Sequence, residues 1–162
     1  LVSSPGTAGA AEVAAVLNHE GELECTAVAD LRPELWHKFI LNCAYNTITA
    51  YYGCTTRGLA EHPERLQQFR TLIREAYAVA RAGDVPLDES VAEDIYDQIL
   101  HRRSLDDTSS TARDFLAHRP SELETFGGTL LRYAARWHVS VPLSESFYIS
   151  LRKKESSYRE NP

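Results

Sequence analysis

The sequence predicts an all-α fold, a single helical domain of about six helices. Most segments carry apolar residues every three or four positions, which is the period of a helix packed against a core. No two alternating segments joined by a turn signal indicate a pair of strands. The length of 162 residues and the apolar fraction of 43% suit one folded domain that needs neither disulfides nor metal.

The first part of the chain contains one short and one long predicted helix. Residues 8–20 are rich in alanine, and Gly21 is a natural C-terminal stop for a helix there. Residues 22–30 briefly alternate acidic and apolar side chains, so they suit either a short strand or an extended linker. From Pro33 to Tyr51 the sequence is apolar on most sides, which predicts a long helix buried nearly all round.

Four more helices are predicted beyond the break at residues 53–58. The segment 63–82 presents one apolar stripe and is followed by glycine, and the segment 88–102 starts with two acidic capping residues. A Ser/Thr/Asp-rich interval then precedes the helices expected over 121–139 and about 143–157.

The segment 121–139 contains two short patterns. Ser121 and Glu124 have the spacing of a capping box, in which each side chain bonds the backbone N–H of the other residue. Gly127 and Gly128 lie inside the helical pattern, which indicates close helix packing and not a phosphate-binding loop.

Charge and cysteine content exclude several classes of function. The chain has 23 acidic and 17 basic residues, and its formal net charge of −6 argues against a nucleic-acid or anionic-membrane partner. Cys25, Cys43 and Cys54 form neither a CxxC motif nor a Cys/His cluster, so no metal site is expected and a reduced, cytoplasmic setting is the simplest one. No signal peptide is visible, and no segment approaches the ~18 consecutive apolar residues of a membrane helix. The chain contains no methionine, and we expect it to be a piece of something longer.

A polar stripe interrupts the otherwise apolar helix predicted over 33–51. It consists of Lys38, Asn42, Asn46 and Thr49. These positions are 4, 4 and 3 residues apart, so at about 100° per residue they fall within an arc of roughly 80°. In a buried helix they need partners, because an unmatched buried amide costs ~1–3 kcal/mol. The stripe therefore either lines a polar cleft or faces water, and the pattern alone favours neither.

The segment 109–124 contains the candidate acid–base partners of Lys38. Ser109 and Ser110 open a short predicted helix, whose hydroxyls and amide ends suit an anion such as a carboxylate. Glu122 falls in the first turn of the following helix, where a surface residue that complements the helix dipole is the more common role.

Several short motifs follow one another along the chain. They are Glu34-Leu35-Trp36-His37-Lys38, Asn42 and Asn46, Ser109-Ser110, Asp114, Ser121-Glu122, Gly127-Gly128, Val141-Pro142 and the run 152–155. Together they resemble the C-terminal domain of ketopantoate reductase (2-dehydropantoate 2-reductase), and the resemblance covers essentially the entire chain. It implies the all-α fold of the 6-phosphogluconate dehydrogenase-like superfamily. The match is specific because the Lys/Asn/Asn period and the 12-residue interval from Ser110 to Glu122 agree at once.

The resemblance implies an enzyme, an NADPH-dependent oxidoreductase that reduces 2-dehydropantoate to pantoate on the route to pantothenate and coenzyme A. By position, Lys38 matches the catalytic lysine, which stabilises the forming alkoxide and supplies its proton. Glu122 matches the acidic partner of that lysine. Asn42 and Asn46 match the carboxamides that hold the far hydroxyl of the substrate, and Ser110 matches the hydroxyl that receives its carboxylate.

The NADP-binding Rossmann half of the family is missing from the chain, because no GxGxxG motif follows a predicted strand. We therefore expect residues 1–31 to be a helix and linker from the preceding half, and residues 32–162 to be the helical domain. NADPH is then bound mainly by the missing domain, and no cofactor-binding residue is assigned here. The expected partners are a small 2-keto acid and the Rossmann domain of the same protein, and a homodimer is compatible with the resemblance. The isolated domain is expected to be inactive.

Two departures from the family pattern leave the substrate open. Asp107 stands where asparagine is usual before the serine pair, and Thr111 replaces the methionine that usually follows it. A reductase of a related 2-keto acid is therefore one alternative. Another is a non-catalytic helical interaction or dimerisation module, although such a module needs none of the polar site residues. A third is an all-α C-terminal domain from the wider family of hydroxyacid dehydrogenases.

Overall fold

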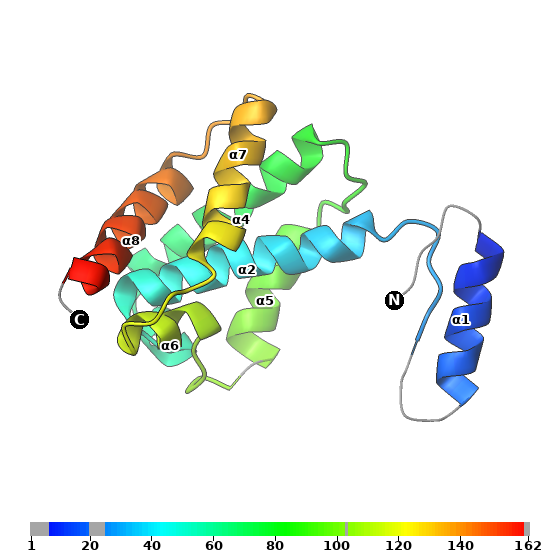
Figure 1. Ribbon diagram of the computed structural model, residues 1–162, viewed down its shortest axis with the longest axis horizontal. Coiled ribbons are helices and arrows are strands. Elements are labelled where there is room, and N and C mark those ends of the chain that lie inside the picture. Colours follow the sequence, from blue (N-terminus) through cyan, green and yellow to red (C-terminus); the bar gives the residue numbers. More distant parts are fainter. Residues whose placement is uncertain (1–6, 20–24, 103, 161–162) are drawn as a thin grey trace. The chain divides into compact units, whose positions relative to one another are not determined.

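The computed structural model describes residues 7–19, 25–102 and 104–160 and shows a chain built from helices. In chain order they are α1 (Thr7–His19), α2 (Arg32–Tyr52), α3 (Thr56–Ala60), α4 (Pro63–Ala82), α5 (Val91–Arg102), α6 (Ser110–Leu116), η1 (Glu124–Gly128), α7 (Thr129–Arg136) and α8 (Pro142–Glu160) (Figure 1). The all-α prediction is confirmed. Two differences from the predicted elements arise: α3 begins inside the segment 53–58 that was predicted to be a break, and the segment 121–139 divides into a π-helix, η1, and the α-helix α7. The short helix α6 forms at the serine pair, as predicted.

Proline and glycine set the ends of the helix that was predicted best. α4 starts at Pro63 and ends before Gly83, at the bounds that the sequence indicated. In contrast, α5 starts at Val91 and not at the acidic pair that precedes it. The reason is local, because Asp88 Oδ1 accepts the backbone N–H of Ser90 at 2.9 Å and so stabilises a turn before the helix.

The first of two compact units, Leu1–Trp36, contains α1 and the connection to α2. Asn18 bonds the backbone of Cys25 twice: its Nδ2 donates to the carbonyl at 2.6 Å, and its Oδ1 accepts from the N–H at 2.7 Å. From residue 25 onward the connection has one bridge residue, Ala27, and otherwise no regular secondary structure. Of the two predicted alternatives, the described part of this segment is therefore an extended linker and not a strand. The predicted stop at Gly21 lies outside the described residues.

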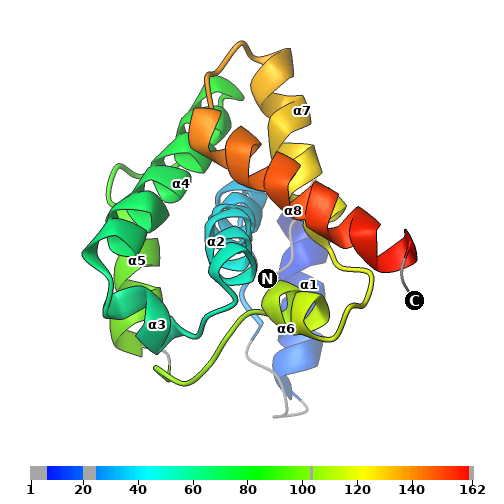
Figure 2. The ribbon, with the colours of Figure 1, turned by 90° about the vertical axis from the view of Figure 1, so that its left-hand side faces the viewer.

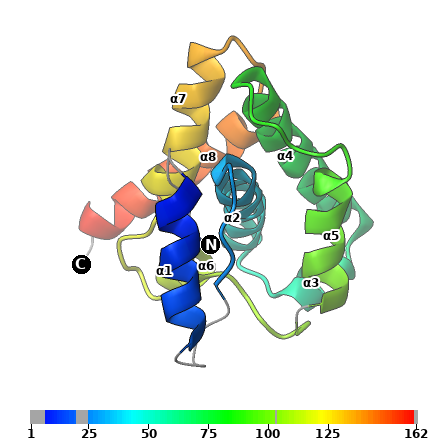
Figure 3. The ribbon, with the colours of Figure 1, turned by 90° about the vertical axis from the view of Figure 1, so that its right-hand side faces the viewer.

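The second unit, His37–Pro162, is organised around α2. Figures 2 and 3 show α2 with α4 and α5 on one side and α6 and α7 on the other. From Cys43 to Ala50 every residue of α2 is buried, as predicted for a helix enclosed nearly all round. The prediction is wrong for the first part of α2, where Glu34, Leu35 and Lys38 are exposed. The burial of α2 therefore increases along the polar stripe from Lys38 to Thr49.

A buried carboxylate attaches α8 to α4. Glu75, which is 9% exposed, accepts the backbone N–H groups of Leu143 at 2.9 Å and Ser144 at 2.8 Å, and the Ser144 hydroxyl at 2.6 Å. These N–H groups belong to the first turn of α8 and have no partner within the helix. The negative charge also complements the positive end of the helix dipole. α8 is thereby fixed where it packs on η1, the segment that forms part of the candidate site.

Candidate functional site

Three segments of the second unit meet at a narrow cleft that both polar and apolar residues line. Its lining residues are Asn46 and Thr47 of α2, Thr111 of α6, and Glu122, Leu123, Phe126 and Gly127 in or just before η1. The cleft is too narrow to admit a water molecule. Its carboxylate, amide and hydroxyl groups are those that bind polar ligands through hydrogen bonds.

η1 forms one wall of the cleft through a widened helical turn. The backbone N–H of Thr129 bonds the carbonyl of Glu124, five residues earlier, which is the spacing of a π-helix. Gly127 is buried, and a β-carbon on it would lie 2.9 Å from the ring of Tyr148 on α8. The predicted close helix packing at this glycine is confirmed.

Phe126 anchors this wall to α2. Its ring centroid lies 6.2 Å from that of Phe39, and its carbonyl accepts the thiol of Cys43 at 3.6 Å. Burial raises the pKa of the Cys43 thiol well above its ordinary value of 9.0, so the thiol keeps the proton that it donates. Phe39 and Cys43 directly follow Lys38 and Asn42 in sequence, so the wall runs beside the polar stripe.

Hydrogen bonds fix the first turn of α6 against α2. Ser109 is the N-cap of α6, and its Oγ accepts the N–H of Ala112 at 3.0 Å. The same Oγ lies 2.7 Å from Oγ1 of Thr49, the last residue of the polar stripe, which is fully buried. The predicted short helix at the serine pair is confirmed. This end of the stripe therefore faces protein and not water.

The predicted capping box at Ser121 and Glu124 is wrong, because both residues have partners on other elements. The N–H and the hydroxyl of Ser121 donate to Glu155 on α8 at 2.9 and 2.7 Å. Glu124 accepts from the hydroxyl of Tyr148 and from the guanidinium of Arg132. The hydrogen bond from Tyr148 and, with a smaller effect, that from Arg132 lower the pKa of the Glu124 carboxyl below its ordinary value.

The predicted site residues of α2 lie at different depths. Asn46 is buried and lines the cleft. Asn42 is half-buried one turn earlier, and Lys38 is exposed a further turn away, about 12 Å from Asn46 along the helix axis. Neither Lys38 nor Asn42 is among the residues that line this narrow cleft.

The other two predicted residues come from the opposing segments. Glu122 is exposed and lines the cleft with Asn46, so the structure brings together an amide and a carboxylate that are distant in sequence. Ser110 is exposed at the start of α6 and is not a lining residue, although its neighbour Thr111 is.

Thr111 is the site residue that sequence reasoning missed. It was noted only as a departure from the family pattern, yet its side chain is 1% exposed and lines the cleft. A hydroxyl directly after the serine pair, at a position where the family resemblance leads one to expect methionine, was the available signal. The side chain of Asp107, the other departure, is exposed, and its backbone carbonyl accepts the N–H of Thr56 at 2.9 Å.

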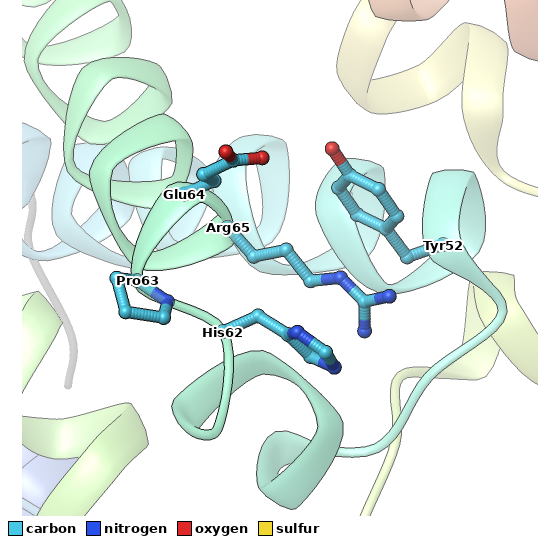
Figure 4. A pocket seen from close by; sticks show the side chains of 5 residues that line it. All are labelled: Tyr52, His62, Pro63, Glu64 and Arg65. Atoms are coloured by element: carbon cyan, nitrogen blue, oxygen red, sulfur yellow. The ribbon is translucent and has the colours of Figure 1, made fainter.

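A larger depression of about 550 Å³ lies where α2 ends and α4 begins. It is lined by Tyr52, His62, Pro63, Glu64 and Arg65 (Figure 4). The guanidinium of Arg65 lies 4.5 Å from the centre of the Tyr52 ring and donates to the carbonyl of Gly58 at 2.7 Å. This cation is therefore held by structural contacts, and the lining includes none of the predicted site residues.

Among the described residues, no group of three or more His, Cys, Asp or Glu side chains could hold a metal ion. In the same part of the chain, no helix combines the length and apolar character needed to cross a membrane.

The chain is similar to ketopantoate reductases in sequence and in fold. Residues 30–155 match the family described as ketopantoate reductase PanE/ApbA C terminal. A 2-dehydropantoate 2-reductase of Shigella flexneri is 30% identical over 131 residues, which are 80% of this chain and 41% of that protein. A solved PanE/ApbA family ketopantoate reductase from Ralstonia eutropha JMP134 is 27% identical, with a TM-score of 0.83 over 94% of this chain and 50% of its own. The chain thus spans half or less of the length of these relatives.

More distant structures share the fold. A dimeric ketopantoate reductase from Staphylococcus aureus has a TM-score of 0.85 at 20% identity, over 96% of this chain and 54% of its own. A D-mandelate dehydrogenase solved with NADH and anilino(oxo)acetate has a TM-score of 0.83 at 19% identity, over 96% of this chain and 65% of its own.

Proposed function

The chain belongs to the ketopantoate reductase C-terminal family, and we propose that it forms the substrate-binding and catalytic-lysine half of an NADPH-dependent 2-dehydropantoate 2-reductase. The observation that carries this proposal is the cleft that Asn46 and Glu122 line together. Asn42 and Lys38 lie one and two turns before Asn46 on the same face of α2. The polar stripe therefore continues from the cleft at Asn46 toward the start of the helix.

Lys38 is the proton donor in this proposal. When the keto carbon is reduced, its oxygen becomes strongly basic, and an ammonium within hydrogen-bond distance stabilises the developing charge and supplies the proton. The exposure of Lys38 supports this role, because its ammonium is accessible to a substrate. Glu122 accepts the hydrogen bond of the resulting hydroxyl and orients it.

The remaining site residues hold the two ends of the substrate. The amides of Asn42 and Asn46 bind the far hydroxyl, for which an amide offers both a donor and an acceptor. The hydroxyl of Ser110 receives the carboxylate. Its position is supported by the neighbouring Ser109, whose bond to Thr49 at 2.7 Å fixes this turn beside α2.

The reduction also needs a hydride donor, which the described residues do not fit. They contain no glycine-rich turn between a strand and a helix, the element that receives the pyrophosphate of a dinucleotide. We therefore assign NADPH binding to a Rossmann half of the same protein, outside this chain. Without that half the chain is expected to be inactive as a reductase.

The test is a reductase assay of the two-domain protein with 2-dehydropantoate. Lys38→Ala is expected to lower kcat by about 10²–10⁴-fold, because the variant lacks the proton donor and the positive charge. Lys153→Ala, which removes an exposed lysine on α8, is the matched control and is expected to keep the wild-type kcat. A Lys38→Ala variant that retains most of its turnover contradicts the assigned role.

A further inference from the structure

Thr111 carries the only buried side-chain polar atom without a hydrogen-bond partner in the described part of the chain. The residue is 1% exposed, and it lines the same cleft as Asn46 and Glu122. Buried hydroxyls in proteins nearly always have a partner, because an unbonded one loses its interaction with water and gains nothing in return. The exception at Thr111 falls at the candidate site.

The carbonyls that the hydroxyl of a helical threonine commonly bonds have other partners at Thr111. Thr111 lies in the first turn of α6, so the carbonyls three and four residues earlier belong to Thr108 and Asp107, which precede the helix. The carbonyl of Asp107 accepts the N–H of Thr56 at 2.9 Å and the hydroxyl of Tyr45 at 3.2 Å. The carbonyl of Thr108 accepts from Arg113 at 3.1 Å, and the hydroxyl of Thr111 bonds neither of the two.

Thr49, on the facing helix, provides the contrast. It is as fully buried as Thr111, but its Oγ1 donates to the carbonyl of Tyr45 at 2.6 Å and lies 2.7 Å from Oγ of Ser109. The cleft at Thr111 does not admit a water molecule, so water cannot take the place of such partners while the cleft is closed.

We propose that Thr111 binds the substrate and determines specificity: its hydroxyl hydrogen-bonds the hydroxyl of a hydroxylated 2-keto acid in the opened cleft. This inference rests on the proposed reductase function and adds a residue that recognises the hydroxyl of its substrate. A site with a polar group placed to bond a substrate hydroxyl discriminates strongly against an analogue that lacks it, because the buried group is then left unpaired.

The charge in the cleft favours a hydroxyl over the carboxylate of the substrate as the partner of Thr111. Glu122 lines the same cleft, and two carboxylates brought close together repel one another. A hydroxyl is neutral and both donates and accepts, so the far hydroxyl can donate to Asn46 and accept from Thr111. The carboxylate is then bound outside the cleft, on the side of the exposed Ser110.

Entry of a ligand requires the cleft to widen. The lining side chain with room to move is that of Glu122, which is exposed. In this proposal rotation of Glu122 opens the cleft while Phe126 stays packed on Phe39 and the buried Gly127 stays packed against Tyr148.

The first arm of the test measures the thermal stability of the ligand-free chain. Thr111→Val has the same shape without the hydroxyl, and it is expected to raise Tm by about 2–4 °C because it removes an unsatisfied buried group. Thr49→Val is the matched control and is expected to lower Tm, because it removes a bonded hydroxyl. A Thr111→Val variant that loses stability as Thr49→Val does indicates a structural role and overturns the proposal.

The second arm measures kcat/KM of the two-domain protein for 2-dehydropantoate and for 3,3-dimethyl-2-oxobutanoate, which lacks the hydroxyl. Thr111→Val is expected to lower kcat/KM for the hydroxylated substrate by about fivefold to tenfold, and to leave the value for the analogue unchanged. Thr111→Ser keeps the hydroxyl and is expected to keep the preference.

The outcomes separate this proposal from the function on which it rests. An active wild type whose preference is unchanged by Thr111→Val overturns the role of Thr111 alone. If Thr111→Val lowers kcat/KM equally for both substrates, Thr111 does not bind the substrate hydroxyl. A wild-type protein that reduces neither substrate contradicts the proposed function itself, and the role of Thr111 with it.

Discussion

Lys38 and Asn46 share one face of α2 but differ in burial, and the proposal gives them different tasks. In that proposal the exposed Lys38 meets charge that develops only as the keto oxygen is reduced, whereas the buried Asn46 binds a hydroxyl that is present throughout. A group that meets charge only in the transition state raises kcat, and a group that binds the substrate equally throughout lowers KM. Kinetic measurements on single variants can therefore distinguish the two.

Asn46→Ala is expected to raise the KM for 2-dehydropantoate about tenfold with a much smaller change in kcat, because it removes hydrogen bonds made equally in the ground and transition states. Steady-state kinetics of the two-domain protein measure both constants. Gln67→Ala, at an exposed position of α4, is the control and should change neither. A loss of kcat as large as that of Lys38→Ala would show that Asn46 acts on the reacting centre.

The two buried threonines show what a sequence can and cannot predict for a single residue. Thr49 belongs to a polar stripe that the helical period makes visible, and the structure gives it partners in Tyr45 and Ser109. Thr111 is as fully buried, but its hydroxyl has no hydrogen-bond partner in the described part of the chain. That condition depends on the coordinates of several segments, so no local pattern reports it.

At the scale of the element, the attachment of α8 depends on the buried carboxylate of Glu75. Glu75→Ala is expected to lower the free energy of unfolding by about 2 kcal/mol, because it leaves the first N–H groups of α8 without an acceptor. Urea denaturation of the chain measures the change. Glu89→Ala, at an exposed position before α5, should stay near the wild-type value. If Glu75→Ala has the same free energy of unfolding as the wild type, the Glu75 carboxylate adds nothing to stability.

Glu124 gives η1 and α7 a pH-dependent attachment to α8. Its pKa in the folded chain is lowered by Tyr148 and then Arg132 from the ordinary value of 4.5, so its contribution to stability is present above pH 4.5 and is lost as the pH falls through the folded pKa. Urea midpoints measured from about pH 6 down to pH 3 should fall less steeply for Glu124→Gln than for the wild type. Parallel curves for the two proteins would show that these contacts do not favour the charged carboxylate.

The helices differ in how far local sequence decides them. α4 has both bounds where proline and glycine predict them. The capping box at Ser121 fails because partners on α8 and α7 compete for the same side chains, and the chain there forms a π-helix instead. A local signal is decisive only where no tertiary partner offers the same groups a better hydrogen bond.

At the scale of the whole molecule, the composition and the helical period suffice to predict an all-α chain. They do not predict that Asn46 and Glu122 line one cleft, because that depends on how α2 and η1 pack. The resemblance to a family implied a role for each of the two residues, and Phe126 links their segments, since it contacts both Phe39 and Cys43 of α2.

The chain on its own is expected to bind NADPH with no measurable affinity. The described residues lack the glycine-rich turn and helix N-terminus that receive a pyrophosphate. Calorimetric titration of the purified chain with NADPH measures this, and the two-domain protein serves as the positive control. Micromolar affinity of the chain alone would place part of the nucleotide site within it.

We propose that the polar stripe on α2 and the cleft beside it hold the substrate, with Lys38 at the reacting oxygen. A crystal structure of the two-domain protein with pantoate tests this placement. We expect the 2-hydroxyl oxygen of pantoate about 3 Å from Nζ of Lys38, with the far hydroxyl at Asn46. If pantoate binds instead in the depression lined by Tyr52 and Arg65, with Lys38 out of hydrogen-bond range, the proposed placement is wrong.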